Sequence, residues 1–537
     1  MPQIKINSIL GGQSPTTNFA GSDQFRASFG IDPSMPIDDS GSAYSTIASG
    51  LLRPTSSIAI AGQTLMKSPL WIKGSSKTAF TYVLDSKGSA YTIDAAMTTT
   101  TAMADGGTLT GGLGNGCEYY DNYMYIAKNT EIARYGPLSS SSVDLFDGDY
   151  WTANLSLTAL VNTAYPTTFK NNLQLPNHPM CRHSDGKLYI GDVVGNQGTL
   201  HYVQTTKTTV EGDTDDGSTY DALELGYGLW PTVIESYGSD LAIALYEGSD
   251  AAIRQKSAKI AFWDTTSTDI NKIVWCEFPD SIITAMKNIN GVLYVVSGNV
   301  DSAGWRLSRF IGGYTFEELY YSETGEPCLP GAIDGTLNRV LVGTHTVVPE
   351  AGCGVYSYGL QKSNLSSGMF NIMRCTGSDA SSNVTALLLA DNTKLGGYSP
   401  IVGWSEYGDG STGAASSIDK QGTSYSGAQS VWWSQTYRTG QHFKVTKIRI
   451  PLVQKIAANM TLSCKVHTDD GVGESYALAT VYNGDYTNSE NHIIFRSTFN
   501  GREITGRNNF WLEIKWTGSA LLTVGLPIII DFELCDE

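Results

Sequence analysis

The chain has 537 residues, of which 41% are hydrophobic and only 16% are charged, below the roughly 25% charged fraction of ordinary soluble domains. Its 35 Lys and Arg against 52 Asp and Glu give a net charge of −17, which repels phosphate backbones and disfavours nucleic-acid binding. No apolar run approaches the about 18 residues needed to cross a bilayer, so we expect no membrane insertion.

The opening residues and the cysteines indicate the compartment in which the chain is made. Met1 to Gly12 lack a basic segment followed by an apolar core, so we expect no Sec signal peptide. The eight cysteines form no CxxC pair and no tight cluster, which favours isolated buried thiols in a reducing cytosol over a zinc site or a disulfide scaffold.

Residues 1–56 contain several Gly and Pro turn signals and few strand-length apolar runs. Such a segment cannot bury a core by itself, so we expect an extended N-terminal arm. The arm is either a disordered tail or a strap that orders on a neighbouring subunit. Six apolar residues could anchor such a strap: Ile4, Ile6, Ile9, Leu10, Phe25 and Phe29.

Residues 57–415 repeat one β unit, which has a polar turn, an apolar strand rich in Tyr, a loop and a second strand ending in an aromatic residue. Asp185-Gly186 and Asn290-Gly291 begin two of the clearest copies, and both dipeptides favour tight hairpin turns. Reference positions in the first strand of each unit fall at 80, 124, 188, 241, 293, 340 and 387.

Seven units at nearly regular spacing predict an all-β fold with a seven-bladed β-propeller over 57–415. The strand Ser57-Ile-Ala-Ile-Ala, just ahead of the first unit, is the candidate for closing the ring. The aromatic residues would fill the gaps between blades. The alternative architecture is a pair of stacked β-sandwiches.

From about Ser411 to Gly427 the chain is mostly Gly, Ser, Thr and Ala, and residues 416–427 are expected to form a linker. A second β domain is expected over 428–537, where seven strand-length segments occur. Apolar and polar residues alternate in two of them, as in Ile448 and Ile450 against Lys447 and Arg449. This pattern predicts a β-sandwich or jelly roll.

No constellation of residues in the chain indicates catalysis. The Asp-box repeats of sialidases are missing, and the nearest string, Asp147-Gly-Asp-Tyr-Trp, has the wrong order. Cys181, His183 and Asp185 bring a thiol, an imidazole and a carboxylate together in sequence, but the Asp-Gly dipeptide is better explained as a blade turn. With 52 acidic residues a carboxylate pair arises by chance, so we assign no catalytic residue.

One acidic loop resembles a calcium loop, with candidate oxygen ligands at Asp213, Asp215, Asp221 and Glu224. Its glycine, Gly217, falls at position five of the loop where calcium loops have it at six, which favours a solvated acidic loop. The seven His form no HxH or HExxH, and neither a P-loop nor a GxGxxG helix start occurs. We therefore predict no metal centre and no cofactor, and calcium binding by the acidic loop stays open.

The opening segment resembles those of structural proteins of environmental tailed bacteriophages. The resemblance lies in Pro2-Gln-Ile-Lys-Ile-Asn-Ser-Ile-Leu-Gly-Gly-Gln-Ser-Pro and in Asp23-Gln-Phe-Arg-Ala-Ser-Phe-Gly-Ile-Asp-Pro, together with low charge and domain order. It implies a virion tail or fibre component that is assembled in the host cytoplasm, with the propeller as scaffold.

The expected function is that of a non-catalytic virion structural protein. It would form a homo-oligomer and contact other tail subunits through the arm. The C-terminal domain or blade loops would reach the host surface, where a glycan is the candidate partner. The alternatives are a virion-associated depolymerase or glycosidase, and a carbohydrate-binding surface adhesin. The sequence does not give the position in the virion, the ring stoichiometry or the host receptor.

Overall fold

A computed structural model describes most of the strands of this chain. The residues described are 2–7, 12–14, 24–29, 46–50, 55–57, 59–61, 69–74, 81–85, 90–93, 99–102, 116–127, 132–136, 144–146, 178–194, 197–204, 210–211, 222–247, 257–267, 273–299, 302–323, 325–336, 339–345, 353–361, 364–375, 382–392, 397–406, 416–421, 428–452, 460–469, 475–477, 481–482, 492–496, 504–518, 522–525 and 527–535. Every regular element among them is a β-strand, which confirms the all-β class.

The chain divides into two compact units. The ring unit comprises residues 57–353 and 375–420, and the terminal unit comprises residues 1–56, 354–374 and 421–537. Within the described residues, no helix is long and apolar enough to cross a membrane.

Seven small sheets follow one another along the chain from the first repeat onward. The first four contain, in order, β7 (Ala59–Ala61), β11 (Thr99–Ala102), β10 (Ala90–Ile93), β9 (Thr81–Asp85) and β8 (Pro69–Gly74); β12 (Gly116–Tyr120), β13 (Tyr123–Ala127), β14 (Ile132–Gly136) and β15 (Asp144–Phe146); β16 (Met180–Arg182), β17 (Lys187–Val194), β18 (Gln197–Gln204) and β19 (Val210–Glu211), with β20 (Leu223–Tyr227) also on β18; and β21 (Leu229–Tyr237), β22 (Asp240–Glu247), β23 (Lys259–Trp263) and β24 (Val274–Glu277).

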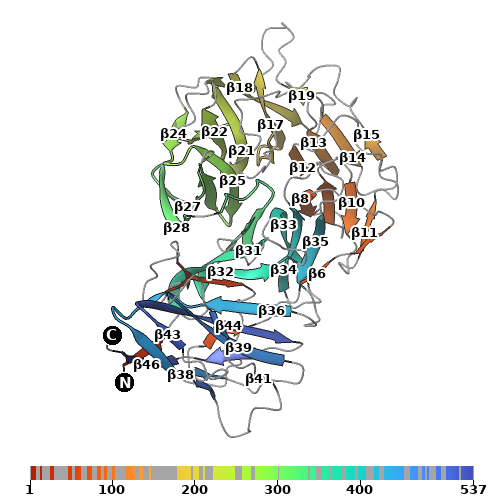
Figure 1. Cartoon of the computed structure of the whole chain (residues 1–537). Helices are drawn as coiled ribbons and strands as arrows, with labels where there is room; N and C mark the ends of the chain where they lie inside the picture. Colours follow the sequence, from red (N-terminus) through yellow and green to blue (C-terminus); the bar gives the residue numbers. More distant parts are fainter. Residues whose placement is uncertain are drawn as a thin grey trace. The chain divides into compact units, whose positions relative to one another are not determined.

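The last three sheets have four strands each. They contain β25 (Ile282–Ile289), β26 (Val292–Gly298), β27 (Trp305–Gly312) and β28 (Thr315–Ser322); β29 (Ile333–Thr336), β30 (Arg339–His345), β31 (Cys353–Gln361) and β32 (Asn364–Arg374); and β33 (Ser382–Asn392), β34 (Gly397–Glu406), β35 (Ser416–Gln421) and β6 (Thr55–Ser57). In the sixth sheet, β29 and β30 belong to the ring unit, whereas residues 354–374 of β31 and β32 belong to the terminal unit. Figure 1 shows the sheets of the ring unit arranged around a common axis. This arrangement is β-propeller-like, and the sheet count is consistent with seven blades.

The predicted closing strand, residues 57–61, is divided in the structure between β6, which ends at Ser57, and β7. β6 supplies the fourth strand of the seventh sheet, and β7 pairs in parallel with β11 of the first sheet. Residues close together in sequence therefore contribute to both the last and the first sheet, which removes two open sheet edges.

The core of the ring unit lies in the gaps between adjacent sheets. Tyr189 of β17 contacts Trp263 of β23 edge to face, with ring centroids 5.5 Å apart, in a buried cluster between the third and fourth sheets. A second cluster between the fourth and fifth sheets contains Phe262 and Val295. The predicted aromatic filling of the gaps between blades is confirmed at these positions.

Tight turns join the first two strands of several sheets. Asn290 and Gly291 both have positive φ, 51° and 84°, in the turn between β25 and β26. Asp121 and Asn122 have the same left-handed geometry between β12 and β13, with φ of 42° and 70°. These hairpins confirm the predicted turns, because Asn, Asp and Gly adopt positive φ at low cost.

Two antiparallel sheets form the terminal unit. One contains β1 (Gln3–Ile6), β46 (Ile528–Leu534), β38 (Phe443–Pro451), β42 (His492–Arg496) and β43 (Ile504–Gly506); the other contains β4 (Ala27–Phe29), β36 (Ala428–Trp433), β44 (Asn509–Gly518), β39 (Met460–Thr468), β40 (Ser475–Ala477), β37 (Tyr437–Arg438) and β41 (Val481–Tyr482). Phe510 of β44 packs on Phe443 and Phe532 of the other sheet, at centroid distances of 5.0 and 6.1 Å. Two short pairs complete the unit, β2 (Gly12–Gln13) with β3 (Gln24–Phe25) and β45 (Leu522–Gly525) with β5 (Thr46–Gly50).

The structure corrects two expectations about domain boundaries. The described strands of the N-terminal arm, 1–56, are not a disordered tail, because β1 and β4 pair with β46 and β36. Residues 416–421 are not linker but form β35, because Ile418 and Asp419 are fully buried in the seventh sheet. Residues 422–427 lie outside the described residues.

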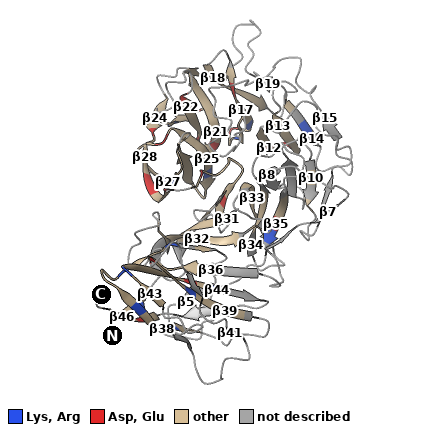
Figure 2. Cartoon of the chain, viewed as in Figure 1, with Lys and Arg blue, Asp and Glu red and all other residues tan. Residues whose placement is uncertain are grey.

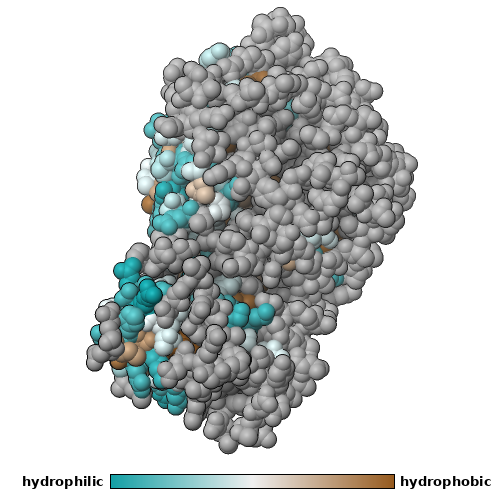
Figure 3. Space-filling model, viewed as in Figure 1, coloured by the Kyte–Doolittle hydropathy of each residue, from teal (hydrophilic) through white to brown (hydrophobic). Residues whose placement is uncertain are grey.

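Charged residues are sparse along the strands of the ring unit, as Figure 2 shows. The described surface on the face drawn in Figure 3 is mainly hydrophilic. Among the described residues the large exposed apolar side chains are Tyr227, Ile311, Tyr314 and Leu534.

Candidate functional site at the ring axis

The innermost strands of three sheets share a local irregularity. A β-bulge in each places a buried threonine out of register: Thr232 in β21, Thr284 in β25 and Thr385 in β33. A bulge re-aims the side chains that follow it. The third residue after each threonine, Glu235, Lys287 or Leu388, lines a pocket at the ring axis.

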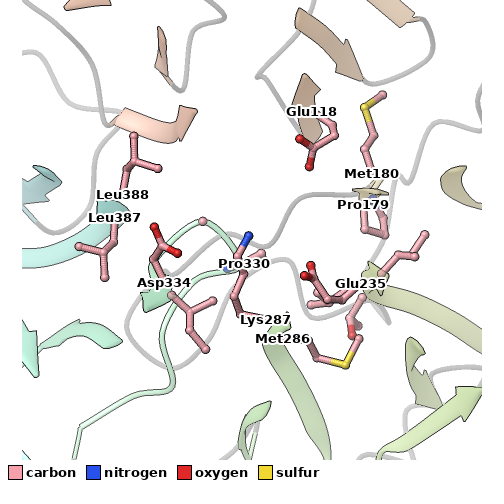
Figure 4. Close-up of a pocket in the computed structure, with 15 residues that line it drawn as sticks. Glu118, Pro179, Met180, Glu235, Met286, Lys287, Pro330, Asp334, Leu387 and Leu388 are labelled. Carbon is pink, nitrogen blue, oxygen red and sulfur yellow. The ribbon is translucent and has the colours of Figure 1, made fainter. Parts of the chain in front are cut away.

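This axial pocket has a volume of about 80 Å³, which is room for several water molecules. It is lined by residues on or beside the innermost strands of six successive sheets. Its apolar wall includes Met180, Met286 and Leu387, and its polar wall consists mainly of Glu118, Glu235, Lys287 and Asp334. Figure 4 shows the three carboxyl groups and the ammonium group turned toward the pocket interior.

The charges in the pocket interact strongly with one another. Glu235 has the largest effect on Lys287, followed by Asp334 and Glu118, and together these carboxylates raise the pKa of Lys287 above its ordinary value although burial lowers it. Lys287 is therefore an ammonium ion at neutral pH. Three carboxylates and one ammonium leave the pocket with an excess of negative charge.

The carboxylates also bond to the backbone of neighbouring strands. Glu235 Oε1 accepts a hydrogen bond from Asn288 N–H in the next sheet, at 3.0 Å. Asp334 Oδ2 accepts one from Leu389 N–H in the following sheet, at 2.7 Å, and its Oδ1 accepts from Gly335 N–H, at 2.9 Å. Two of the three carboxylates thus link adjacent sheets around the axis.

Other side chains link the innermost strands in the same way. Thr232 Oγ donates to the carbonyl of Ile283 at 2.8 Å, and Asn288 Nδ2 donates to the carbonyl of Ser236 at 2.9 Å. Both bonds join β21 to β25. Because these groups are buried or partly buried, losing a partner would leave an unsatisfied polar atom and destabilise the ring.

Two kinds of chemistry are compatible with the pocket. A pair of carboxylates can act as acid and base in glycoside hydrolysis, and a mixed-charge cavity can bind a small polar ligand. Both oxygens of Asp334 already accept backbone N–H groups, so this carboxylate serves as a structural hydrogen-bond acceptor.

The sequence analysis did not identify these four residues. None lies in a recognisable motif, since each comes from a different sheet. The only signal is the three-residue spacing from the bulge threonine, which recurs as Thr232 to Glu235, Thr284 to Lys287 and Thr385 to Leu388.

The structure separates Cys181, His183 and Asp185. Cys181 belongs to the core between the third and fourth sheets. His183 Nδ1 bonds Ser236 Oγ at 2.8 Å, and Asp185 accepts a bond from Tyr189 Oη at 2.7 Å in the blade turn. Their contacts are structural.

Of the candidate calcium ligands only Glu224 is described, and it is exposed in β20. Asp213, Asp215 and Asp221 lie outside the described residues. Where the chain is described, no group of three or more His, Cys, Asp or Glu has the geometry to hold a metal ion.

A second buried charged cluster lies within the third sheet. Asp192 is 3.5 Å from His178 Nδ1 and 3.7 Å from His201 Nε2, and all three side chains are fully buried. Asp192 Oδ1 also accepts from Val193 N–H at 2.7 Å. His178 and Asp192 also contact the backbone of this sheet, at Gly191 O and Val193 N–H, so we assign the cluster a structural role.

Comparisons with solved structures find likenesses at low identity. The chain is similar to the Neurospora crassa Pan2 WD40 domain, at 10% identity and a TM-score of 0.37 over 66% of this chain and 89% of that chain. It is also similar to the N-terminal domain of Nup159, at 11% identity and a TM-score of 0.34 over 66% and 89% of the two chains. A third likeness is to an exo-β-1,3-galactanase of Phanerochaete chrysosporium, at 9% identity and a TM-score of 0.27 over 67% and 97%.

At these identities and TM-scores the likenesses carry no argument about this chain. No protein-family model matches the chain, and no curated protein matches it.

Proposed function

We propose that this chain is a non-catalytic structural protein of a tailed-bacteriophage virion, a tail or fibre component in which a seven-bladed propeller serves as scaffold. The observation that carries the non-catalytic part is the bonding of the pocket carboxylates. Glu235 and Asp334 accept backbone N–H groups of the next sheet, so their charges are used to hold the ring together. The virion part is supported by the resemblance of residues 2–15 and 23–33 to phage structural proteins.

The terminal unit is proposed to be a β-sandwich of jelly-roll type. Packing of Phe510 on Phe443 and Phe532 from the facing sheet supports this proposal. Its loops, or loops of the propeller, are the proposed contacts with the host surface.

Labelling of virus particles tests the virion assignment. Antibodies against the chain, marked with gold, are added to particles of a phage whose genome encodes it and viewed by cryo-electron microscopy. We expect the label at one fixed position on the tail. Particles that carry no label, while the free protein binds the antibody, would contradict the assignment.

The second candidate function is a carbohydrate-active enzyme, because the axial pocket brings three carboxylates together. Reducing ends released from host surface polysaccharide are measured for the natural chain and for Glu235→Gln. Gln keeps an oxygen that can accept the Asn288 N–H bond while removing the charge. We expect no release from either protein; release by the natural chain that Glu235→Gln abolishes would establish the enzyme instead.

A further inference from the structure

The N-terminal segment completes both sheets of the terminal unit. β1 is the edge strand beside β46, with Gln3 opposite Asp531 and Lys5 opposite Ile529. β4 is the edge strand beside β36, with Ser28 opposite Trp432. One short stretch of chain therefore covers one edge of each sheet, and edges left open are sites for pairing with other chains.

Residues of this segment are part of the core of the terminal unit. Phe25 is fully buried, with its ring 5.3 Å from that of Phe370 and 6.4 Å from that of Trp432. Ile6, Gln13 and Ser28 are also buried. Without residues 2–29 this core would lose its cover, so the terminal unit needs an N-terminal segment, either its own or one from another copy.

Polar contacts fix the register of the segment. Gln3 Nε2 donates to Asp531 Oδ1 at 2.7 Å, and the Arg26 guanidinium lies over the Trp511 ring, 4.8 Å from its centroid. All these partners belong to the terminal unit. The described strands from β1 to β5 pair only with strands of the terminal unit. These strands could therefore move to another copy without breaking a strand pairing in the ring unit.

Attachment to the chain's own sheets leaves some polar atoms unsatisfied. Both amide atoms of Gln13 and the hydroxyl of Ser28 are buried with no hydrogen-bond partner among the described residues. Each such atom opposes burial of the segment, whichever copy supplies it, and offsets part of the gain from burying Phe25 and Ile6. The segment is therefore held less firmly than its buried area suggests.

We propose that copies of this chain assemble by exchanging residues 2–29, so that β1 and β4 of one copy complete the two sheets of a second copy. Exchange keeps every contact described above and replaces only the chain connection, which makes it a low-cost route to a closed oligomer. The inference deepens the proposed structural function by naming the partner and the surface. Exchange would let the N-terminal segment act as the expected strap between subunits, while β1 and β4 keep the pairing seen with β46 and β36.

A disulfide trap tests the exchange in the full chain. Lys5→Cys and Ile529→Cys place two thiols on directly opposed residues of β1 and β46. After oxidation of the assembled protein, we expect most of the linked material to run at twice the chain mass or more on a non-reducing denaturing gel. Material linked entirely within single chains would overturn the proposal.

The single variants Lys5→Cys and Ile529→Cys serve as matched controls for links through natural cysteines. Of the seven cysteines whose side chains the structure describes, all are buried except Cys535, which is half-buried. On the non-reducing gel, each control should run only at the mass of a single chain.

A second measurement needs no substitution. Natural chain with ordinary nitrogen is mixed with chain labelled with ¹⁵N, assembled together and treated with an amine-reactive cross-linker. We expect Lys5 to Lys447 cross-links between a light and a heavy peptide. Cross-links that join only peptides of the same isotope would contradict exchange. A protein that is monomeric at all concentrations would contradict it as well.

These outcomes are independent of the virion assignment. A monomer that still labels the phage tail would exclude exchange alone, and an exchanged oligomer absent from particles would exclude the virion role alone.

Discussion

The central electrostatic interaction at the residue scale is that of Lys287 with Glu235, Asp334 and Glu118. The ammonium offsets carboxylates whose oxygens also hold neighbouring strands. Removing one member of a buried charge network leaves the other charges uncompensated. The stability lost in this way is much larger than the net stability that the intact network contributes.

We predict that Lys287→Met lowers the free energy of unfolding by about 2 kcal/mol, because three carboxylates then face one another in the pocket. Urea denaturation followed by tryptophan fluorescence measures the change. Lys287→Arg keeps the positive charge, so its free energy of unfolding should fall less. Adding Glu235→Gln to Lys287→Met should restore part of the lost free energy of unfolding. Equal stability of Lys287→Met and the natural chain would show that the ammonium has no structural role.

Asp469 holds the turn before β44. Partial burial opposes its ionisation, but hydrogen bonds from the backbone N–H groups of Asn508, Asn509 and Arg507 lower the pKa of its carboxyl group. Because the pKa is lower in the folded than in the unfolded chain, the stabilisation is present above pH about 4 and is lost as pH falls through the folded-state pKa.

Asp469→Asn should therefore reduce the melting temperature at pH 7, by a stability loss of about 1 kcal/mol. The difference from the natural chain should shrink as the pH is lowered below about 4. Differential scanning calorimetry across that range measures both effects. Glu323→Gln, at an exposed position, is the control and should change neither; a deficit in Asp469→Asn that is the same at every pH would refute the electrostatic explanation.

At the scale of elements, the sequence predicted the second and third strands of most sheets and missed most of the innermost ones. Tyr-rich strands after Asn-Gly or Asp-Gly turns have a clear local signal. β21 contains Pro231, and bulges at Thr232 and Thr284 break the alternation that marks a strand. The axial residues lie on these strands, so the candidate site could not be predicted without the fold.

The N-terminal strands were missed for a different reason. β4 has only three residues, and its strand conformation depends on pairing with β36, about 400 positions away in sequence. The same applies to β35, in which Ile418 is the only large apolar residue of a polar stretch.

Two glycines in the ring should respond differently to substitution by alanine. A Cβ on Gly198 would lie 1.8 Å from the carbonyl oxygen of Leu229, where β18 meets the strand that begins the next sheet. A Cβ on Gly291 would meet nothing within 4 Å, and only the positive φ of 84° opposes it.

We predict that Gly291→Ala costs about 1 kcal/mol and that Gly198→Ala costs several-fold more or prevents folding. Chemical denaturation of the two variants, with the yield of soluble protein, measures the order. A Gly198→Ala protein as stable as Gly291→Ala would show that the third and fourth sheets do not approach this closely.

At the scale of the whole molecule, the chain divides into two compact units. Phe25 contributes to the terminal unit through Phe370 and Trp432. Truncating a buried phenylalanine to alanine costs about 3 kcal/mol or more through lost burial and the cavity left behind.

Phe25→Ala should therefore loosen the terminal unit and leave the ring unit unchanged. Hydrogen exchange followed by mass spectrometry should show faster exchange in β36 and β44, with unaltered protection in β22 and β26. Leu534→Ala, at an exposed position, is the control. Equal acceleration in both units would mean that they unfold as one.

A crystal structure of the full chain tests the central claim, that a closed ring of sheets uses its axial charges as structural links. We predict seven sheets around one axis, with Glu235 on the N–H of Asn288 and Asp334 on the N–H of Leu389. A different number of sheets, or an open axial cleft in which these carboxylates bond no backbone group, would contradict it.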